Sequence, residues 1–183
     1  MPARPPSPDD HLLPADESQP PPELHANCEL ELVMTLARRV FRAPHCALSW
    51  WRAPQVWSTS APGEPASHHA FGKTLCSAVM QQDRALVIPD LAQQPALRQK
   101  LAPGGHDAPL RFFAGAPLRN GRGDVVGALT VGDTEARDHT DPAWLSEITE
   151  FASLAMNAIV HARLSRTRDQ DLHLFASGPM VAM

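Results

Sequence analysis

A cysteine near the start of a predicted helix is the residue best placed to do chemistry in this sequence. Cys76 lies in the segment 71–82, whose apolar residues recur at helical spacing. The dipole at a helix N-terminus lowers the pKa of a nearby thiol and makes it more nucleophilic. The alternative role is that of a small buried residue, since free cysteines pack well in protein cores. Both roles are open from the sequence.

The other two cysteines do not extend this chemistry to a disulfide or a metal. Cys28 and Cys46 leave an odd total of three, and the sequence contains no Cys-x-x-Cys and no Cys/His pattern typical of zinc sites. Unpaired cysteines favour a reducing compartment. We therefore expect a cytoplasmic protein without a structural metal.

Aromatic and charged residues provide the chemistry for a planar or anionic ligand. Trp57, in a tryptophan-rich predicted hairpin, suits an aromatic wall, and Arg111 shares one strand face with Phe113. Core packing, or a surface ion pair of Arg111 with Asp90 or Asp107, accounts for the same residues. We predict a ligand-binding site made of Trp57, His69, Phe71, Cys76, Asp90, Arg111 and Phe113.

Other catalytic and metal-binding patterns are weak. His68 and His69 adjoin near Glu64, but adjacent side chains in an extended segment point to opposite faces and make a poor chelate. The sequence shows no Ser-His-Asp arrangement, no phosphate-cradling loop and no carboxylate pair on one element. We therefore expect a domain that is not an enzyme, with an unknown cofactor if there is one.

Charge and hydropathy exclude two classes of partner. Residues 1–22 contain eight of the 19 prolines, four acidic residues and one arginine, so the remaining chain changes from a formal charge of −4 to −1. A nearly neutral body lacks the basic face that nucleic acid requires. No apolar run approaches the 18 residues of a membrane span. Residues 1–22 are predicted to be a disordered, proline-rich leader.

The elements that would position these residues alternate between helices and strands. Helical spacing predicts a helix of about 18 residues within 24–42, a short helix at 71–82 and another at 95–101. A hairpin is predicted from two runs, 46–51 and 55–59, followed by a loop at 60–70.

Strands and helices also alternate in the second half of the chain. A buried strand at 85–88 and a second hairpin at 111–118 and 124–131 precede a helix from Asp141 to about Arg168, roughly 40 Å long. Asn120-Gly121 is typical of a hairpin turn with positive φ angles. The order predicts an α+β fold in which a mostly antiparallel sheet is flanked by helices, with long N- and C-terminal helices.

Four segments in this order resemble the GAF domains. They are Thr74-Leu-Cys-Ser-Ala-Val-Met80, Leu86-Val-Ile-Pro-Asp90, Arg111-Phe-Phe-Ala-Gly-Ala-Pro-Leu118 and Gly127-Ala-Leu-Thr-Val-Gly-Asp133. The resemblance covers about residues 24–165 and implies a GAF/PAS-like fold. It implies a GAF domain over 23–168, including the N-terminal helix and an exit signalling helix.

The resemblance also implies a function. GAF domains act as small-molecule sensors ahead of output domains, so we expect a non-catalytic sensory module of a bacterial signalling protein, with an output such as cyclic-di-GMP turnover. Some GAF domains reduce free methionine sulfoxide with a cysteine that follows a Gly-Lys pair, as Cys76 follows Gly72-Lys73. That alternative lacks a second cysteine within 89–110. Bilin attachment is a weaker alternative because Ser77 replaces the usual histidine. A ligand-free dimerisation scaffold is a third.

The terminal helices of GAF regulators commonly build a dimer. We predict a homodimer interface formed by Val33, Leu36, Val40, Leu145, Ile148, Ala152, Ala155 and Ile159. Residues 169–183 are predicted to begin a truncated PAS-like domain or a linker, because they are too apolar for a free tail.

Overall fold

A six-stranded antiparallel sheet lies at the centre of the part of the chain that the computed structural model describes, residues 27–60, 66–99 and 109–176. The strand order is β3-β2-β1-β6-β5-β4. The strands are β1 (His45–Arg52), β2 (Gln55–Thr59), β3 (Ser67–Ala70), β4 (Leu86–Ile88), β5 (Phe112–Arg119) and β6 (Val125–Asp133). The α+β class predicted from the sequence is confirmed, whereas the predicted leader lies outside the described residues.

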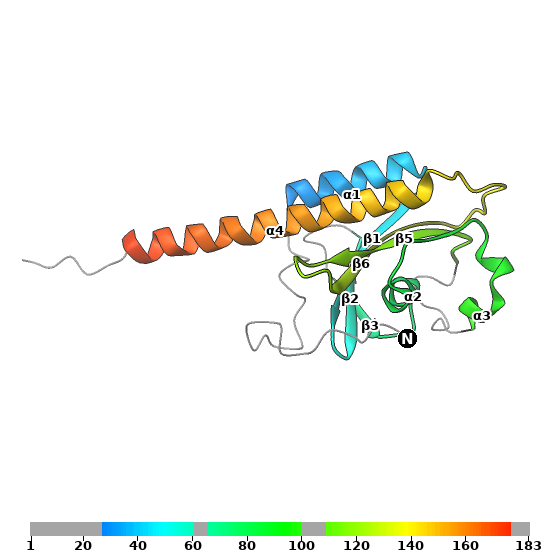
Figure 1. Ribbon diagram of the computed structural model, residues 1–183, viewed down its shortest axis with the longest axis horizontal. Helices are drawn as coiled ribbons and strands as arrows, with labels where there is room; N and C mark the ends of the chain where they lie inside the picture. The colour runs from blue at the N-terminus through cyan, green and yellow to red at the C-terminus, as the bar shows by residue number, and fades with distance from the viewer. Residues whose placement is uncertain (1–26, 61–65, 100–108, 177–183) are drawn as a thin grey trace, which may run out of the picture.

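Helices cover both faces of this sheet (Figure 1). They are α1 (Cys28–Val40), α2 (Leu75–Gln82), the 3₁₀ helix η3 (Leu91–Gln93), α3 (Pro95–Arg98) and α4 (Trp144–Ala176). The long pair α1 and α4 packs on one face, which we call the helix-pair face, and α2 packs on the other, the α2 face. None of the helices in the described ranges combines the length and apolar character needed to cross a bilayer.

Side-chain alternation along the strands divides the core between these two faces. On β1, Leu48 and Trp50 point to the helix-pair face, while Trp51 points to the α2 face. On β5, Phe112 and Phe113 separate in the same way. Nearly every residue of β6 is buried, because this strand lies between β1 and β5 and is covered on both sides.

Polar side chains fix where the helices begin. The side chain of Asn27 accepts hydrogen bonds from the backbone N–H of Glu29 and Leu30 at the start of α1. Thr74 caps α2 in the same way through Ser77. The predicted helix at 71–82 therefore begins four residues later, because the Thr74 backbone is extended.

Two details of the predicted strands are wrong. The loop predicted over 60–70 contains β3, which pairs with β2 along the sheet edge. The turn between β5 and β6 does not use positive φ angles at Asn120-Gly121. Instead the Asn120 side chain accepts from the N–H of Arg122 and Asp124, and Gly123 takes the left-handed conformation with φ of 89°.

Helix α4 is longer than predicted and runs antiparallel to α1. It has 33 residues and continues to Ala176, so the predicted domain boundary after residue 168 falls inside it. The Asn27 side-chain amide donates to the Ala158 carbonyl at 3.0 Å, and the Phe41 ring, at the other end of α1, packs against the tilted ring of Trp144. The C-terminal part of α4 extends beyond both α1 and the sheet (Figure 1).

A glycine in β5 allows α2 to approach the sheet. A Cβ added to Gly115 would lie 2.9 Å from side-chain atoms of Phe113 and Thr130, and 3.0 Å from Val79 of α2. The glycine is thus explained by tight packing of the helix on the sheet rather than by space left for a ligand.

We predict that Gly115→Ala destabilises the domain by about 1–3 kcal/mol, because the added methyl group overpacks the contact between α2 and the sheet. Gly121→Ala is the matched control: nothing lies within 4 Å of its added Cβ. Urea unfolding of both variants measures the difference. Equal stability of the two variants would contradict this role for Gly115.

Candidate functional site

The predicted ligand-binding residues do not form one site. Cys76, Phe113 and Phe71 pack in or against the apolar cluster on the α2 face. Trp57 lies on the opposite, helix-pair face, only 4% exposed, with its ring 4.7 Å from that of His68. The sheet separates Trp57 from Cys76, which corrects the prediction that both line one pocket.

Cys76 is a buried residue at the first turn of α2. Its side chain is 6% exposed, and its Sγ lies 2.9 Å from the Thr74 hydroxyl. The same hydroxyl lies 2.7 Å from that of Ser77, so three polar side chains share the start of the helix. Cys76 packs among apolar residues of the α2 face, as expected for the core role left open by the sequence.

The two histidines of β3 point to opposite faces of the sheet edge. His69 is half-buried and pairs with Val56, whereas His68 is exposed and pairs with Trp57. The described residues contain no group of three or more histidine, cysteine or acidic side chains able to hold a metal ion.

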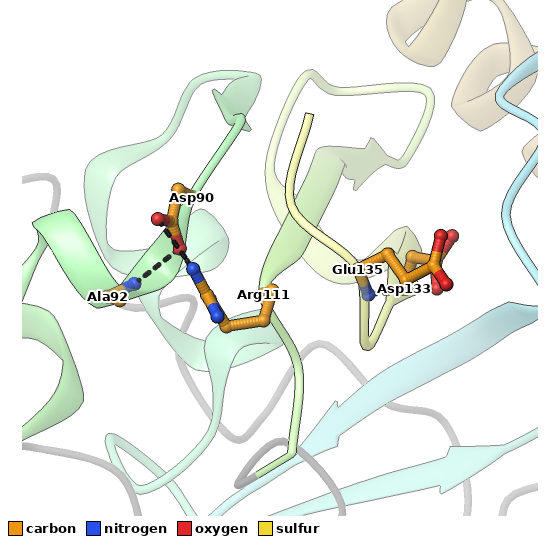
Figure 2. A network of polar contacts seen from close by, with 5 residues as sticks. All are labelled: Asp90, Ala92, Arg111, Asp133 and Glu135. Atoms are coloured by element: carbon orange, nitrogen blue, oxygen red, sulfur yellow. Dashed lines mark hydrogen bonds and ion pairs between the residues drawn. The ribbon is translucent and has the colours of Figure 1, made fainter. Parts of the chain in front are cut away.

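Asp90 and Arg111 form a two-pronged ion pair at the corner where β4 leads into η3 (Figure 2). The Arg111 Nε donates to Asp90 Oδ1 at 2.7 Å and its Nη2 donates to Oδ2 at 2.9 Å. Asp90 Oδ1 also accepts from the Ala92 N–H at 2.9 Å. The Arg111 hydrogen bonds, followed by that of Ala92, hold the pKa of Asp90 far below its usual range.

This ion pair connects to the ends of the central strands. The Arg111 N–H donates to the Asp133 carbonyl at 2.7 Å, and the Arg111 carbonyl accepts from Leu91 at 2.6 Å. We call the group formed by Asp90, Arg111, Asp133 and Arg137 the polar corner. Asp133 is the last residue of β6, and its carboxylate accepts from the N–H of Glu135; both residues are drawn in Figure 2.

Arg137 links the polar corner to the helix pair, and no motif in the sequence around it identifies it as a functional residue. Its Nη2 donates to Asp133 Oδ2 at 2.8 Å and to the Arg42 carbonyl just after α1 at 2.9 Å. Its backbone N–H donates to the Pro89 carbonyl, and its guanidinium lies 4.8 Å from the Phe112 ring centre. Through its backbone and its side chain, Arg137 therefore connects the segment after β4 with the end of β6 and the end of α1.

Half of the predicted dimer interface is buried inside the chain. Four of its residues on α4 are at most 2% exposed, because they pack on the sheet and α1: Ile148, Ala152, Ala155 and Ile159. They have no surface to offer a second copy, which corrects that part of the prediction. The error arises because one apolar stripe looks the same whether it covers a sheet or a partner helix.

The remaining predicted residues lie on the outer side of the helix pair. Leu36 is 40% exposed and Val40 44%, and Val33 is half-buried. Leu145, near the start of α4, is 48% exposed. These positions remain accessible to a partner.

Two further leucines, missed from the sequence, extend this surface. Leu32 is 59% exposed, one turn before Leu36 on α1, and Leu154 of α4 is 50% exposed. The contacts of Asn27 with Ala158 and of Phe41 with Trp144 set the register of the two helices. This register places Leu154 opposite the turn of α1 that contains Leu32. We define the outer helix patch as Leu32, Leu36, Val40 and Leu154.

We predict that Asp90→Asn destabilises the domain at neutral pH, and by a smaller amount in acid. Because folding lowers the pKa of Asp90, its contribution to stability is complete above the ordinary pKa of about 3.9. The contribution decreases as the pH falls below that value, because the unfolded state then takes up the proton first. Denaturant unfolding from pH 7 to pH 3 should show the two proteins converging. A constant difference in unfolding free energy would contradict the ion pair's role.

Comparisons with known proteins agree with this fold. The GAF domain family model matches residues 27–161, and no curated protein matches. The GAF domain of a phosphoenolpyruvate-protein phosphotransferase from Coxiella burnetii has a TM-score of 0.59 at 20% identity, covering 82% of this chain and 89% of that one. Residues 122 to 287 of a methyl-accepting chemotaxis protein give 0.59 at 16% identity, covering 74% and 88%. A free methionine-R-sulfoxide reductase from Neisseria meningitidis gives 0.56 at 15% identity, covering 74% and 78%. These identities support the fold alone, but the family model spans well over half of the sequence, and the chain therefore belongs to the GAF domain family.

Proposed function

We propose that this GAF domain is a regulatory module that forms a homodimer through α1 and α4 and transmits a signal along α4, without catalysing a reaction. The observation that carries this proposal is the outer helix patch. Its four large apolar side chains, each at least 40% exposed, lie on neighbouring turns of two packed helices. A contiguous apolar surface of this kind is typical of an interaction site.

The projecting part of α4 supports the same proposal. The helix is about 50 Å long, and its C-terminal part extends past α1 and the sheet (Figure 1). Leu164, at the start of that part, is 62% exposed. A single helical segment in water is only marginally stable, because packing supplies most of the stability of protein helices.

A second copy of the chain satisfies both features at once. In a two-fold dimer the same surface is used on each protomer, so one patch covers the other. The projecting helices would also be brought side by side. Neither a small ligand nor a short peptide would cover both the patch and the projection.

Arg137 supports a relay from the polar corner to the helix pair. Its backbone N–H donates to the Pro89 carbonyl. Its guanidinium donates to the Asp133 carboxylate and to the Arg42 carbonyl at the end of α1. A small molecule bound near the α2 face would change the loops that begin at this corner. Similarity to the chemotaxis protein is consistent with a regulatory role. A cytoplasmic location and an output in cyclic-di-GMP turnover stay predictions from the sequence.

We predict that the chain has twice its 19.9 kDa mass in light scattering at high micromolar concentration. Leu36→Glu should shift it to the monomer, because a carboxylate in an apolar interface loses its hydration. Gln99→Glu, an equal charge change at an exposed residue after α3, should leave the dimer intact. Circular dichroism checks that both variants fold. A wild-type monomer would overturn the dimer, and a dimeric Leu36→Glu would overturn the assigned surface.

The alternative of a methionine sulfoxide reductase depends on Cys76, and the position of the other cysteines argues against it. Cys46 is buried on the helix-pair face, where desolvation raises its pKa to about 12, and Cys28 begins α1 on that same side. Cys76 is on the α2 face. A disulfide needs Cα atoms about 6 Å apart, so neither cysteine is placed to resolve an oxidised Cys76.

We therefore expect no reduction of free methionine sulfoxide by the wild-type chain with a thiol reductant, measured by loss of substrate. Cys76→Ser should be indistinguishable from it. Turnover that disappears in Cys76→Ser and persists in Cys28→Ser would establish the enzyme and refute the non-catalytic proposal.

A further inference from the structure

A cavity of about 380 Å³ lies between α4 and the edge of the sheet, away from the residues predicted to bind a ligand. Helix α4 forms one wall over two turns, from Thr149 to Asn157. The other wall comes from the end of β5, where Arg119 lies, and from Arg84 and Ala85 just before β4. We call this cavity the α4 groove. Its volume is at the lower end of those that hold small molecules.

The sheet leaves this space open for a structural reason. Strand β4 begins at Leu86, opposite Gly115, so among the described residues no strand covers the outer side of β5 beyond that point. Pro117 stands there and has no N–H of its own to leave unpaired at this edge. On the opposite wall, the side chains of Ala152 and Ser153 on α4 are small and leave the space between helix and sheet unfilled.

Two arginines give the groove a positive rim. Arg119 is held in place: its Nη1 donates to the Gly123 carbonyl at 2.9 Å, and its Nη2 lies 2.6 Å from Asp83 Oδ1. Arg84 is exposed, and its Nη2 donates to the neutral side chain of Gln82 at 3.0 Å. Asp83 balances the charge of Arg119, so the charge of Arg84 is in excess.

The helix wall offers hydrogen-bond acceptors. The Thr149 hydroxyl donates to the Leu145 carbonyl at 2.7 Å, and the Ser153 hydroxyl donates to the Thr149 carbonyl at 3.0 Å. Each hydroxyl has one proton, so both present only lone pairs to the groove. A matching ligand needs N–H or O–H donors on this side and an anion on the arginine side.

We propose that the α4 groove binds a small anion that also carries hydroxyl or amino groups, the chemistry shared by sugar phosphates and hydroxy acids. Arg84 and Arg119 contact the anion, and Thr149 and Ser153 accept from the donors. Such a ligand would connect α4 to the sheet about two turns before the helix leaves the domain. The site does not depend on the proposed dimer.

Isothermal titration calorimetry on the full chain tests this with three probes: glucose 6-phosphate, malate and inorganic phosphate. We expect one of the first two to bind with a Kd of about 1 mM or tighter, and more weakly as salt is added. Arg84→Gln should weaken that binding roughly tenfold or more, because a charge-assisted hydrogen bond is lost. Arg98→Gln, an equal charge change on α3, should bind like the wild type. The sugar phosphate or the hydroxy acid is identified by whichever probe binds.

Ser153→Trp provides a second variant, because an indole ring at this exposed position fills the groove without entering the core. It should abolish binding, and its thermal unfolding without ligand should match that of the wild type. Binding by neither organic probe, or unchanged binding in Arg84→Gln, overturns the proposal. Inorganic phosphate binding as tightly as glucose 6-phosphate overturns the part assigned to the hydroxyl acceptors.

Discussion

Burial of the central strands on both faces is the constraint on which the rest of this structure depends. Strand β6 has almost no exposed residue, so it is stable only while helices cover the sheet above and below it. On one side α2 meets this requirement through the missing side chain of Gly115. On the other side α1 and α4 share it, and each helix uses only one stripe. The outer sides of both helices do not contact the sheet, and the exposed apolar residues of the outer helix patch lie there.

Covering a sheet on both sides separates the two layers, so communication between them must pass around its edge or end. The polar corner is such a passage, since Arg111, Asp133 and Arg137 connect the ends of β5 and β6 with the chain after α1. Hydrogen bonds to charged groups depend strongly on geometry, whereas apolar contacts tolerate small shifts. In the proposed relay, a displacement of the Pro89–Asp90 segment would reach Arg42 through these hydrogen bonds more directly than through the packed core.

The sequence correctly predicts elements whose local residue pattern favours the same structure that the folded chain adopts. The hairpins and the start of α4 follow from apolar runs and turn residues. Strand β3 was missed because Ser67-His-His-Ala70 has no apolar alternation and forms only by pairing with β2. The sequence wrongly predicts Ile148 and Ile159 in a dimer interface, because periodicity shows that a stripe is buried but not which element covers it. Arg137 lies in an irregular segment, where only the folded chain brings its partners together.

The attachment of α1 to α4 has a mechanical consequence. Asn27 and Glu29 hold the first turn of α1 against Ala158 and His161, at the point where α4 leaves the domain. When a second copy packs against it, as in the proposed dimer, the helix beyond this support is an arm of about 20 Å. A tilt of about 5° at the support moves its tip by roughly 2 Å, which is comparable to the helix shifts that switch protein interfaces. Under the proposed signalling role, changes of a few tenths of an ångström in the packed domain would be converted into displacements that a partner surface can distinguish.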